Sequence, residues 1–395
     1  MAKQVSFRAI IPSRKKCFRD EMLIMGQSEG LGPCAPRPTS VVLRKQTNVT
    51  PNLNKVEDQR MIHRLAIVLV GLVAALCCFS QAIEGAAEPV QVQRSGYEIN
   101  VTIGGKPFTT YYFNPDVAKP YLQPLRSAQG TIVTRGFPIG NTVPPEHIHD
   151  RALEPHQRPL YFAHGDIDGI DFWSEQVFNR FYGRTPGSHA YGRMVFRKID
   201  EMRGGPDSGV IQAEFDLISP NKRVIATETQ KFTFRGDEQT RTIDCDFVVH
   251  AGENPVVFGD TKEGTFGIRL APELDSPPAH MIDSNGAEGE KGIWGTRANW
   301  VDYDGTVNGE SLGIAVFDSP RSFRHPTYWH ARGYGLFAAN PFGVSFFTRD
   351  PQQDGSATIQ PGKSLLFRYR VFIHHGDYQQ AHVAEAYRQY AEQER

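Results

Sequence analysis

Apolar and polar residues alternate over much of the chain beyond residue 87, which is the pattern of half-buried β-strands. The clearest pair of alternating runs is 97–103 and 107–113, with Gly104-Gly105 between them. Because two glycines permit the positive φ angles of a tight turn, this segment predicts a β-hairpin. Further strands are predicted at 194–199, 209–218, 223–234, 241–250, 265–270, 312–317, 344–347 and 365–374.

These runs predict a mainly β protein. Turn residues such as Ser219-Pro220-Asn221 separate them, and no regular alternation of helix and strand patterns supports a doubly wound α/β fold. We therefore expect a large antiparallel sandwich of two sheets with one C-terminal helix. That helix is predicted at 380–393, after a capping-box pattern formed by Asp377 and Gln380. Its apolar residues at helical spacing are Val383, Ala386, Tyr387 and Tyr390.

The N-terminal part contains an apolar run of 15 residues, 65–79, directly after Arg64. This run is short for a membrane span and suits the central region of a signal peptide. We expect translation to begin at Met61, a signal peptide at 61–87, and an exported single domain at 88–395. Residues 1–60 are then a spurious or disordered extension. The alternative is a membrane anchor formed by an uncleaved 65–79 segment.

Composition narrows the possible partners. The chain has 43 Lys and Arg against 44 Asp and Glu, which argues against a basic nucleic-acid-binding surface. Four of its five cysteines precede residue 88, so the predicted mature part has no internal disulfide. The remaining one, Cys245, alternates with Ile243 and Phe247 and is expected to be a buried, inert thiol. The chain has no nucleophile elbow, Walker A loop or Rossmann fingerprint.

Histidines gather between residues 146 and 166, in segments that the pattern leaves as loops. A cluster of neutral imidazoles could bind a transition metal, although no established metal-binding spacing is present. The alternative is that these side chains make local hydrogen bonds. The four histidines are His147, His149, His156 and His164.

Other chemically distinctive residues lie beside predicted strands. Glu263 follows Lys262 at the start of the run 265–270, where it could act as a base or form a solvated ion pair. Trp329 could stack on a sugar ring or belong to the core. The remaining residues that we consider for substrate binding are Trp173, Arg297, Trp300 and His325, and His330 is a further candidate for proton transfer.

Six stretches of the predicted mature part are distinctive: 119–138, 162–173, 259–271, 295–305, 325–343 and 367–377. Together they resemble a family of secreted bacterial proteins of unknown function that carries the label "methane oxygenase PmoA". The resemblance implies a β-rich domain of this size and no established chemistry. Many members have D-H-P-H-H-R-G where this chain has LEPHQRP at 153–159, so that only Pro155, His156 and Arg158 match. The departures at Leu153, Glu154, Gln157 and Pro159 raise the possibility of altered activity.

Our leading hypothesis is an exported carbohydrate-active enzyme on a sandwich similar in architecture to the galactose mutarotase group. Glu263 is the candidate base, and His156, His164 and His330 are candidate acids or proton shuttles. Arg158, Arg297 and Trp329 would position the sugar, together with Trp173, Trp300 and His325. The first alternative is a glycan-binding module without turnover. The second is a metal-dependent oxidoreductase using some of the four clustered histidines, and we leave the cofactor open.

Overall fold

A computed structural model of the protein describes residues 85–136, 154, 156–175 and 190–394. All of them belong to the second of two compact units, Gln81–Arg395. The expected extension at 1–60 and most of the expected signal peptide lie outside the described residues, as do His147 and His149. No described helix is long and apolar enough to cross a membrane.

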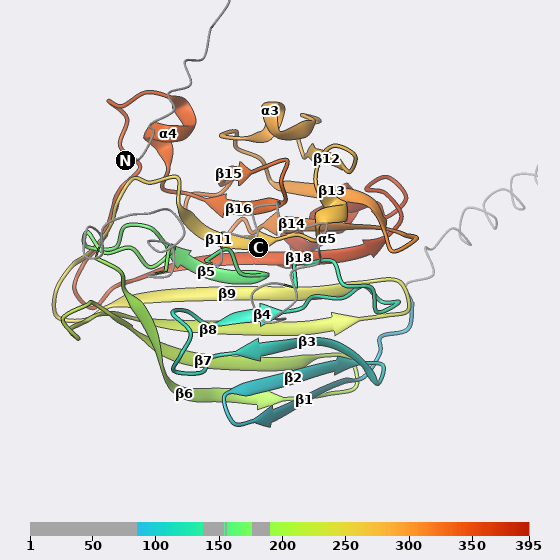
Figure 1. Cartoon of the computed structure of the whole chain (residues 1–395), viewed down its shortest axis with the longest axis horizontal. Coiled ribbons are helices and arrows are strands. Elements are labelled where there is room, and N and C mark those ends of the chain that lie inside the picture. Colours follow the sequence, from blue (N-terminus) through green and yellow to red (C-terminus); the bar gives the residue numbers. More distant parts are fainter. Residues whose placement is uncertain (1–84, 137–153, 155, 176–189, 395) are drawn as a thin grey trace, which may run out of the picture. The chain divides into compact units, whose positions relative to one another are not determined.

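Two eight-stranded antiparallel sheets form the body of this unit (Figure 1). Sheet 1 has the order β1-β2-β3-β4-β5-β11-β16-β15, and sheet 2 has the order β12-β13-β14-β18-β9-β8-β7-β6. The antiparallel two-sheet architecture expected from the alternation is therefore confirmed. The strands of sheet 1 are β1 (Val90–Ser95), β2 (Glu98–Ile103), β3 (Lys106–Tyr112), β4 (Tyr121–Gln123), β5 (Leu160–His164), β11 (Gly264–Arg269), β16 (Leu336–Asn340) and β15 (Tyr328–Ala331).

Sheet 2 contains the longest strands, which extend side by side across the molecule in Figure 1. A separate two-stranded sheet pairs β10 (Val256–Phe258) with β17 (Ala357–Ile359). The strands of sheet 2 are β12 (His280–Asp283), β13 (Trp300–Val307), β14 (Glu310–Asp318), β18 (Ser364–His375), β9 (Arg241–Ala251), β8 (Val224–Gly236), β7 (Gly209–Ile218) and β6 (Arg193–Arg203). Helical elements are η2 (Pro272–Leu274), α3 (Gly289–Ile293), α4 (Val344–Thr348) and α5 (Val383–Gln393).

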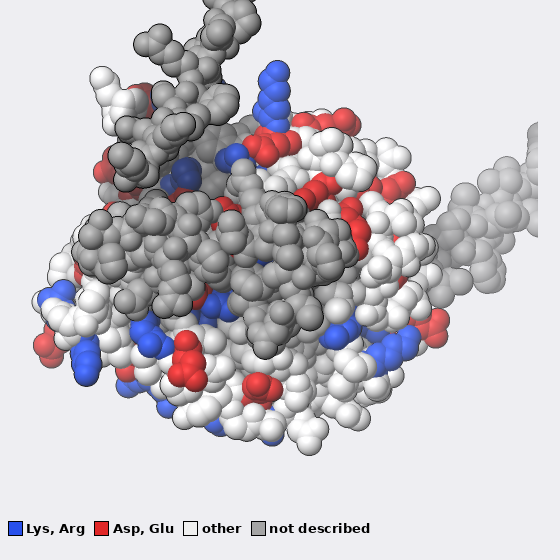
Figure 2. Space-filling view, viewed as in Figure 1, with Lys and Arg blue, Asp and Glu red and all other residues white. Residues whose placement is uncertain are grey.

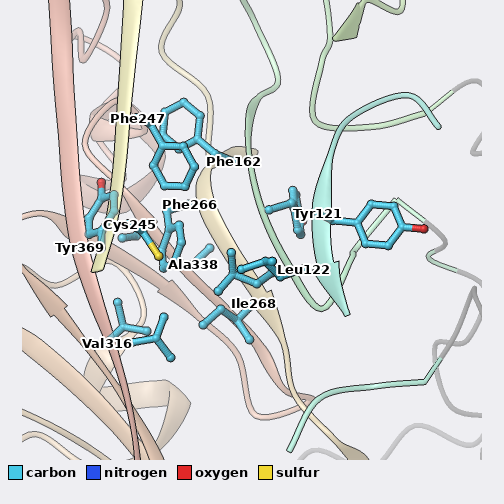
Figure 3. Close-up of a cluster of buried hydrophobic side chains, with 14 of the residues drawn as sticks. Tyr121, Leu122, Phe162, Cys245, Phe247, Phe266, Ile268, Val316, Ala338 and Tyr369 are labelled. Carbon is cyan, nitrogen blue, oxygen red and sulfur yellow. The ribbon is translucent and has the colours of Figure 1, made fainter. Parts of the chain in front are cut away.

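Aromatic side chains from both sheets interlock to form the core between them (Figure 3). Phe162 of sheet 1 stacks on Phe247 of sheet 2 with ring centroids 4.3 Å apart, and Phe266 stacks on Tyr369 at 4.8 Å. Cys245 lies in the same cluster and is fully buried, and burial raises the pKa of its thiol well above the usual value. Its predicted role as an inert core residue is confirmed.

The predicted hairpin is confirmed as β2 and β3, joined at Gly104-Gly105, where both residues have positive φ. The strand predicted at 344–347 is wrong, because this segment forms the short helix α4. Asp260 Oδ2 accepts from the backbone N–H of Ser345 in its first turn, and Asn340 Oδ1 accepts from that of Phe342 just before the helix. These two hydrogen bonds favour a helical turn over the extended form that the apolar composition indicates.

The predicted C-terminal helix is confirmed, although α5 begins at Val383 and not at residue 380. The Asp377 and Gln380 hydrogen bonds form as the capping-box pattern predicts, but they close a turn that precedes the helix. His382, at a φ of 50°, separates that turn from α5. The helix packs Val383 and Tyr390 onto the face of sheet 2 that points away from sheet 1.

Charged side chains of both signs are visible on the face shown in Figure 2, between uncharged ones. Sheet 2 carries cross-strand ion pairs such as Arg370 with Asp244 and Arg368 with Asp246. Such pairs satisfy the polar face of long strands without creating a strongly charged surface.

Candidate active site

The candidate site lies on the outer face of sheet 1, meaning the face turned away from sheet 2. Phe266 and Ile268 of β11 point into the core, so the alternate residues Thr265, Gly267 and Arg269 point outward. Strand pairing places Tyr161 and Ala338 on either side of Gly267, and His330 beside Ala338. The outer face therefore carries a row in which two small residues separate Tyr161 from His330.

Gly267 lets two aromatic rings lie close against β11. A Cβ atom at this position would lie 2.9 Å from Trp173 Cη2 and 3.0 Å from Tyr161 Cζ. These rings contact each other with centroids 4.8 Å apart, and both residues are buried. The phenol end of Tyr161 thus extends across Gly267 towards Ala338 and His330. Only glycine fits beneath the rings.

His330 is held as a neutral imidazole. Its Nδ1 lies 2.7 Å from the backbone oxygen of Lys262, and because a carbonyl oxygen can only accept, Nδ1 carries the proton. Nε2 therefore has the free electron pair. Burial lowers the pKa of His330 to about 4 in spite of the nearby Glu263 carboxylate. At neutral pH this side chain is therefore uncharged, and Nε2 is the atom that can accept a proton.

Glu263 is an ionised carboxylate beside His330. Burial alone would raise its pKa, but its neighbours, among them the charged Lys262, lower it below the usual value. The Lys262 ammonium contacts the carboxylate directly, and 34% of the Glu263 side chain is exposed to solvent. A partly exposed carboxylate next to a neutral histidine can exchange protons with a bound molecule.

His156 completes the group of proton-transfer candidates that the fold brings together. It is buried, and burial together with the positive charge of Lys119 lowers its pKa to about 3. The negative charge of the Glu263 carboxylate raises the pKa of His156 in part, so the two groups interact electrostatically. Electrostatic interactions thus link three of the four residues predicted for proton transfer, which come from distant parts of the chain.

A buried charged triad borders this group. Arg158 Nε lies 3.0 Å from Glu175 Oε1, and Arg158 Nη2 lies 2.7 Å from Glu175 Oε2. Lys119 Nζ lies 3.1 Å from Glu175 and 2.5 Å from the backbone oxygen of Trp173. The two cations also cover aromatic rings, with Arg158 over Tyr121 at 4.8 Å and Lys119 over Tyr161 at 4.9 Å.

Two further buried arginines were missed at the sequence level. Arg269 Nη1 lies 2.8 Å from Gln157 Oε1 and 3.8 Å from a carboxylate oxygen of Glu154. Arg135 donates to the backbone oxygens of Glu154 and Gln157. Two of the positions that depart from the family pattern, Glu154 and Gln157, are therefore built into this network. In the predicted strand 265–270, residues 265, 267 and 269 share one face. A charged residue on that face was the signal that would have identified Arg269.

His164 does not join Glu263, His156 and His330. It is buried on the core side of β5, where its ring packs against Phe258 and Phe342. Its Nε2 lies 2.9 Å from the backbone oxygen of Gly259, and burial lowers the pKa of His164 to about 4. These contacts give His164 a structural position away from the outer face.

The expected sugar-binding residues are also scattered. Trp329 is fully buried between the sheets and donates from Nε1 to Ala298, so it presents no free face for stacking. Trp300 lies on sheet 2 in the cluster beneath α5. Of the expected tryptophans, Trp173 alone lies on the outer face of sheet 1, where its ring covers Gly267.

Arg297 and His325 have structural partners outside the Glu263 group. The guanidinium of Arg297 donates to the backbone oxygens of Pro326 and Arg324. His325 Nδ1 lies 2.9 Å from the carboxylate of Asp318, which is fully buried. Within the ranges that the structure describes, no group of three His, Cys, Asp or Glu residues is arranged to bind a metal ion.

Comparison with known proteins places most of the chain in one family. A model described as a family of unknown function, DUF6807, matches residues 98–388. This match supports the expected resemblance to a family without assigned chemistry, and it does not extend to the methane oxygenase label or to secretion. No curated protein matches the sequence.

Several solved structures resemble the chain at low similarity. A galactose mutarotase-like protein from Clostridium acetobutylicum is 12% identical, with a TM-score of 0.33, over 73% of this chain and 99% of that protein. Two α-galactosidases, from Geobacillus stearothermophilus and Lactobacillus brevis, are 11% and 6% identical, both with a TM-score of 0.35. The alignments cover 72% and 74% of this chain but only 40% of either α-galactosidase.

Proposed function

The chain belongs to a family of unknown function, DUF6807, and we propose that it is a carbohydrate-active enzyme that performs acid–base chemistry on a sugar. One observation carries the proposal. An ionised carboxylate, Glu263, and a neutral imidazole, His330, lie close together, because His330 bonds to the backbone oxygen of the adjacent Lys262. Acid–base reactions of sugars need such a pair of proton-transfer groups.

The two groups have complementary roles in this proposal. Glu263 removes a proton from the sugar because its carboxylate is ionised and partly exposed. His330 relays protons through Nε2, since its Nδ1 is fixed on the Lys262 carbonyl. Once His330 is protonated, the neighbouring Glu263 stabilises the imidazolium. His156 interacts electrostatically with Glu263. Arg158 binds the Glu175 carboxylate at the edge of the proposed site.

The decisive experiment begins with the purified protein on a glycan array, followed by NMR spectroscopy of each bound sugar to detect turnover. Glu263→Gln and His330→Gln should each lower turnover by about 10²- to 10⁴-fold, with sugar affinity changed only a few-fold. Glu253→Gln and His375→Gln are matched controls at exposed positions and should retain full activity. Full activity in both site variants would refute the assignment.

A glycan-binding module without turnover is the second candidate. The observation in its favour is that Gln157, one of the departures from the family pattern, accepts a hydrogen bond from Arg269. A side chain used in this way supports the binding surface and cannot transfer protons. Binding of a sugar on the array with no chemical change by NMR would favour this candidate over the enzyme.

A metal-dependent oxidoreductase is tested separately, because His147 and His149 lie outside the described residues. Elemental analysis of untagged protein should decide it. About one equivalent of copper, iron or zinc, lost on replacing His156 and His164, would replace our proposal with metal chemistry.

Export through the signal peptide at 61–87 is part of the same proposal, because a sugar-active protein with this apolar run would act outside the cytoplasm. N-terminal sequencing of the protein from its native host should give a first residue close to 88. Peptides from 1–60 in that material would contradict a start at Met61, and an intact 65–79 segment would indicate an anchored form.

A further inference from the structure

A cavity of about 1030 Å³ lies where the edge strands of the two sheets come together. These strands, β1 of sheet 1 and β6 of sheet 2, are both at the lower end of the molecule in Figure 1. The walls of the cavity come from the β1–β2 turn, the segment after β3, the start of β6 and the β7–β8 turn. Ligand pockets usually measure roughly 300–1,000 Å³, so this cavity, the edge pocket, is large enough for a ligand.

One wall of the edge pocket is aromatic. The ring centroids of Phe113 and Phe196 lie 4.7 Å apart, and Tyr97 makes T-shaped contacts with them at 5.9 and 6.4 Å. Tyr97 remains 45% exposed in spite of these contacts, and Val195, which also lines the pocket, remains 42% exposed. Apolar side chains left open to solvent on a concave surface indicate a binding site. The fixed, exposed ring of Tyr97 can stack on the apolar face of a sugar.

Polar side chains at the same pocket either fasten its walls or can reach a ligand. Arg193 donates to the backbone oxygen of Val117, which ties the segment after β3 to β6. Asn114 Oδ1 accepts from the backbone N–H of Val117, so the amide nitrogen of Asn114 can donate elsewhere. Lys222 supplies further donors, and the carboxylate of Asp116 supplies acceptors. This mixture suits sugar hydroxyls, which both donate and accept hydrogen bonds.

Glu175 connects the edge pocket with the group of proton-transfer residues. Its carboxylate lines the pocket, and the same oxygens bind Lys119 and Arg158 at the edge of the proposed site. The charge of Glu175 also acts on His156, which interacts with Glu263. The pocket and the proposed site therefore lie on one continuous part of the molecule, with Glu175 between them.

We infer that the edge pocket is a second sugar subsite, with Tyr97 as its stacking platform, and that the substrate is an oligosaccharide and not a single sugar. The inference rests on the proposed carbohydrate function and specifies the substrate class for it. One unit of the chain stacks on Tyr97, accepts hydrogen bonds from Asn114 and Lys222, and donates to Asp116. The unit that reacts lies beside Glu263.

Isothermal titration calorimetry on the purified full chain tests the inference. The probes are sugars of the glucan, galactan, xylan and polygalacturonate series, each as monosaccharide, disaccharide and tetrasaccharide. In the series that binds, the tetrasaccharide should bind at least about tenfold more tightly than the monosaccharide. Tyr97→Ala should remove most of this gain and leave monosaccharide affinity unchanged, whereas Tyr97→Phe keeps the ring and should keep the gain. Lys222→Gln should weaken tetrasaccharide binding by about threefold.

Met202→Ala and Lys291→Gln are the matched controls. Met202 is 40% exposed near the far end of β6, so its loss also removes an exposed apolar side chain. Lys291 is exposed on α3, which contacts β12 at the opposite edge of sheet 2. Both variants should bind the tetrasaccharide as wild type does. Melting temperatures close to that of wild type establish that each variant folds, as expected for changes at exposed positions.

The outcomes separate this inference from the proposed function. Equal affinity for monosaccharide and tetrasaccharide, or wild-type tetrasaccharide affinity in Tyr97→Ala, would overturn the subsite and leave the acid–base proposal standing. Tetrasaccharide binding that depends on Tyr97 but leads to no turnover would support the subsite and refute catalysis. Binding of no sugar by the folded wild-type chain would overturn both. Tyr97-dependent binding of the dye anilinonaphthalene sulfonate that no sugar displaces would assign the pocket to an apolar ligand and overturn the subsite.

Discussion

Glu175 and Arg158 form a bidentate ion pair in which both side chains are more than nine-tenths buried, and Lys119, fully buried, shares the same carboxylate. Burial would raise the pKa of Glu175, but the two cations outweigh it and lower the pKa to about 2. One carboxylate therefore compensates two buried positive charges at the border of the candidate site. Its removal leaves both charges without a counter-ion in a poorly solvated place.

Glu175→Gln should therefore destabilise the protein by about 3 kcal/mol or more, as expected when one partner of a buried ion pair is lost. Urea unfolding followed by tryptophan fluorescence gives this difference. The matched control is Glu214→Gln, which removes a surface partner of Arg197, itself 44% exposed, and should cost less than about 1 kcal/mol. Equal costs for the two variants would show that the triad contributes no more than a surface pair.

Gly267→Ala is expected to disturb the site through crowding. The added methyl group would come within about 3 Å of Trp173 and Tyr161, so both rings must move away from β11. Overpacking of this kind costs about 1–3 kcal/mol, and the displaced rings should weaken sugar binding. Differential scanning calorimetry and calorimetric titration measure the two effects.

Gly252→Ala provides the control for that variant, because a Cβ atom at Gly252 would meet no atom within 4 Å. Its stability should lie within about 0.5 kcal/mol of wild type. If Gly267→Ala matches it in both stability and sugar affinity, the close approach of Trp173 and Tyr161 is not important for the site.

Sequence patterns predicted the fold well where strands have one polar face. The long strands β7, β8, β9 and β18 alternate because one side packs in the core and the other carries charged pairs. The short strands β5 and β16 are buried on both faces, so they have no period-two pattern and were not predicted. Burial on both faces thus removed the signal in two strands beside the site, although β11, which is also buried on both faces, was predicted at 265–270.

Residue types in the site were easier to predict than their grouping. Glu263, His156 and His330 were candidates by chemistry; the His330–Lys262 hydrogen bond places His330 beside Glu263, and the charge of Glu263 acts on His156. Register separated His164 and Trp329, because adjacent residues of one strand face opposite sides. Local alternation of apolar and polar residues does not show which distant segments pack together. Tyr161 and Lys119 were missed for this reason.

Glu228 is a buried carboxyl group between the sheets, and its pKa is raised by burial to about 8. Gln230 donates to it at 2.7 Å and accepts from the Tyr111 hydroxyl at 2.7 Å. Since the folded pKa lies above the unfolded value near 4.5, the fold loses stability as the pH rises from about 4.5 to 8. Glu228→Gln should therefore raise the free energy of unfolding at pH 7 by about 3 kcal/mol.

The same variant at pH 4 serves as its own control. Glu228 is then largely neutral in both folded and unfolded chains, so the gain should almost vanish. Urea unfolding of both proteins at pH 4 and pH 7 measures the difference. A gain of equal size at the two pH values would indicate a packing effect and would contradict ionisation as the cause.

His164 should make the stability of the fold depend on pH in the opposite direction to Glu228. Burial lowers its pKa to about 4, so the unfolded chain binds protons more readily than the folded chain. Stability contributed by the neutral imidazole is present above about pH 6.5 and is lost as the pH falls towards 4. His164→Leu should remove uptake of about 0.9 proton on unfolding near pH 5, lowering the slope of stability against pH by about 1.2 kcal/mol per unit.

His374, on sheet 2, has a pKa shift opposite in sign to that of His164. Burial alone would lower its pKa, but Asp302, whose carboxylate lies 3.0 Å from Nε2, raises it above the usual value. Stability from this pair is present below about pH 6.5 and declines at higher pH, so His374→Leu should change the slope only above that value. Unfolding free energies measured from pH 4 to 8 distinguish the two histidines. Equal changes of slope near pH 5 in both variants would contradict the assignment of acid sensitivity to His164, because the fold treats the two buried imidazoles in opposite ways.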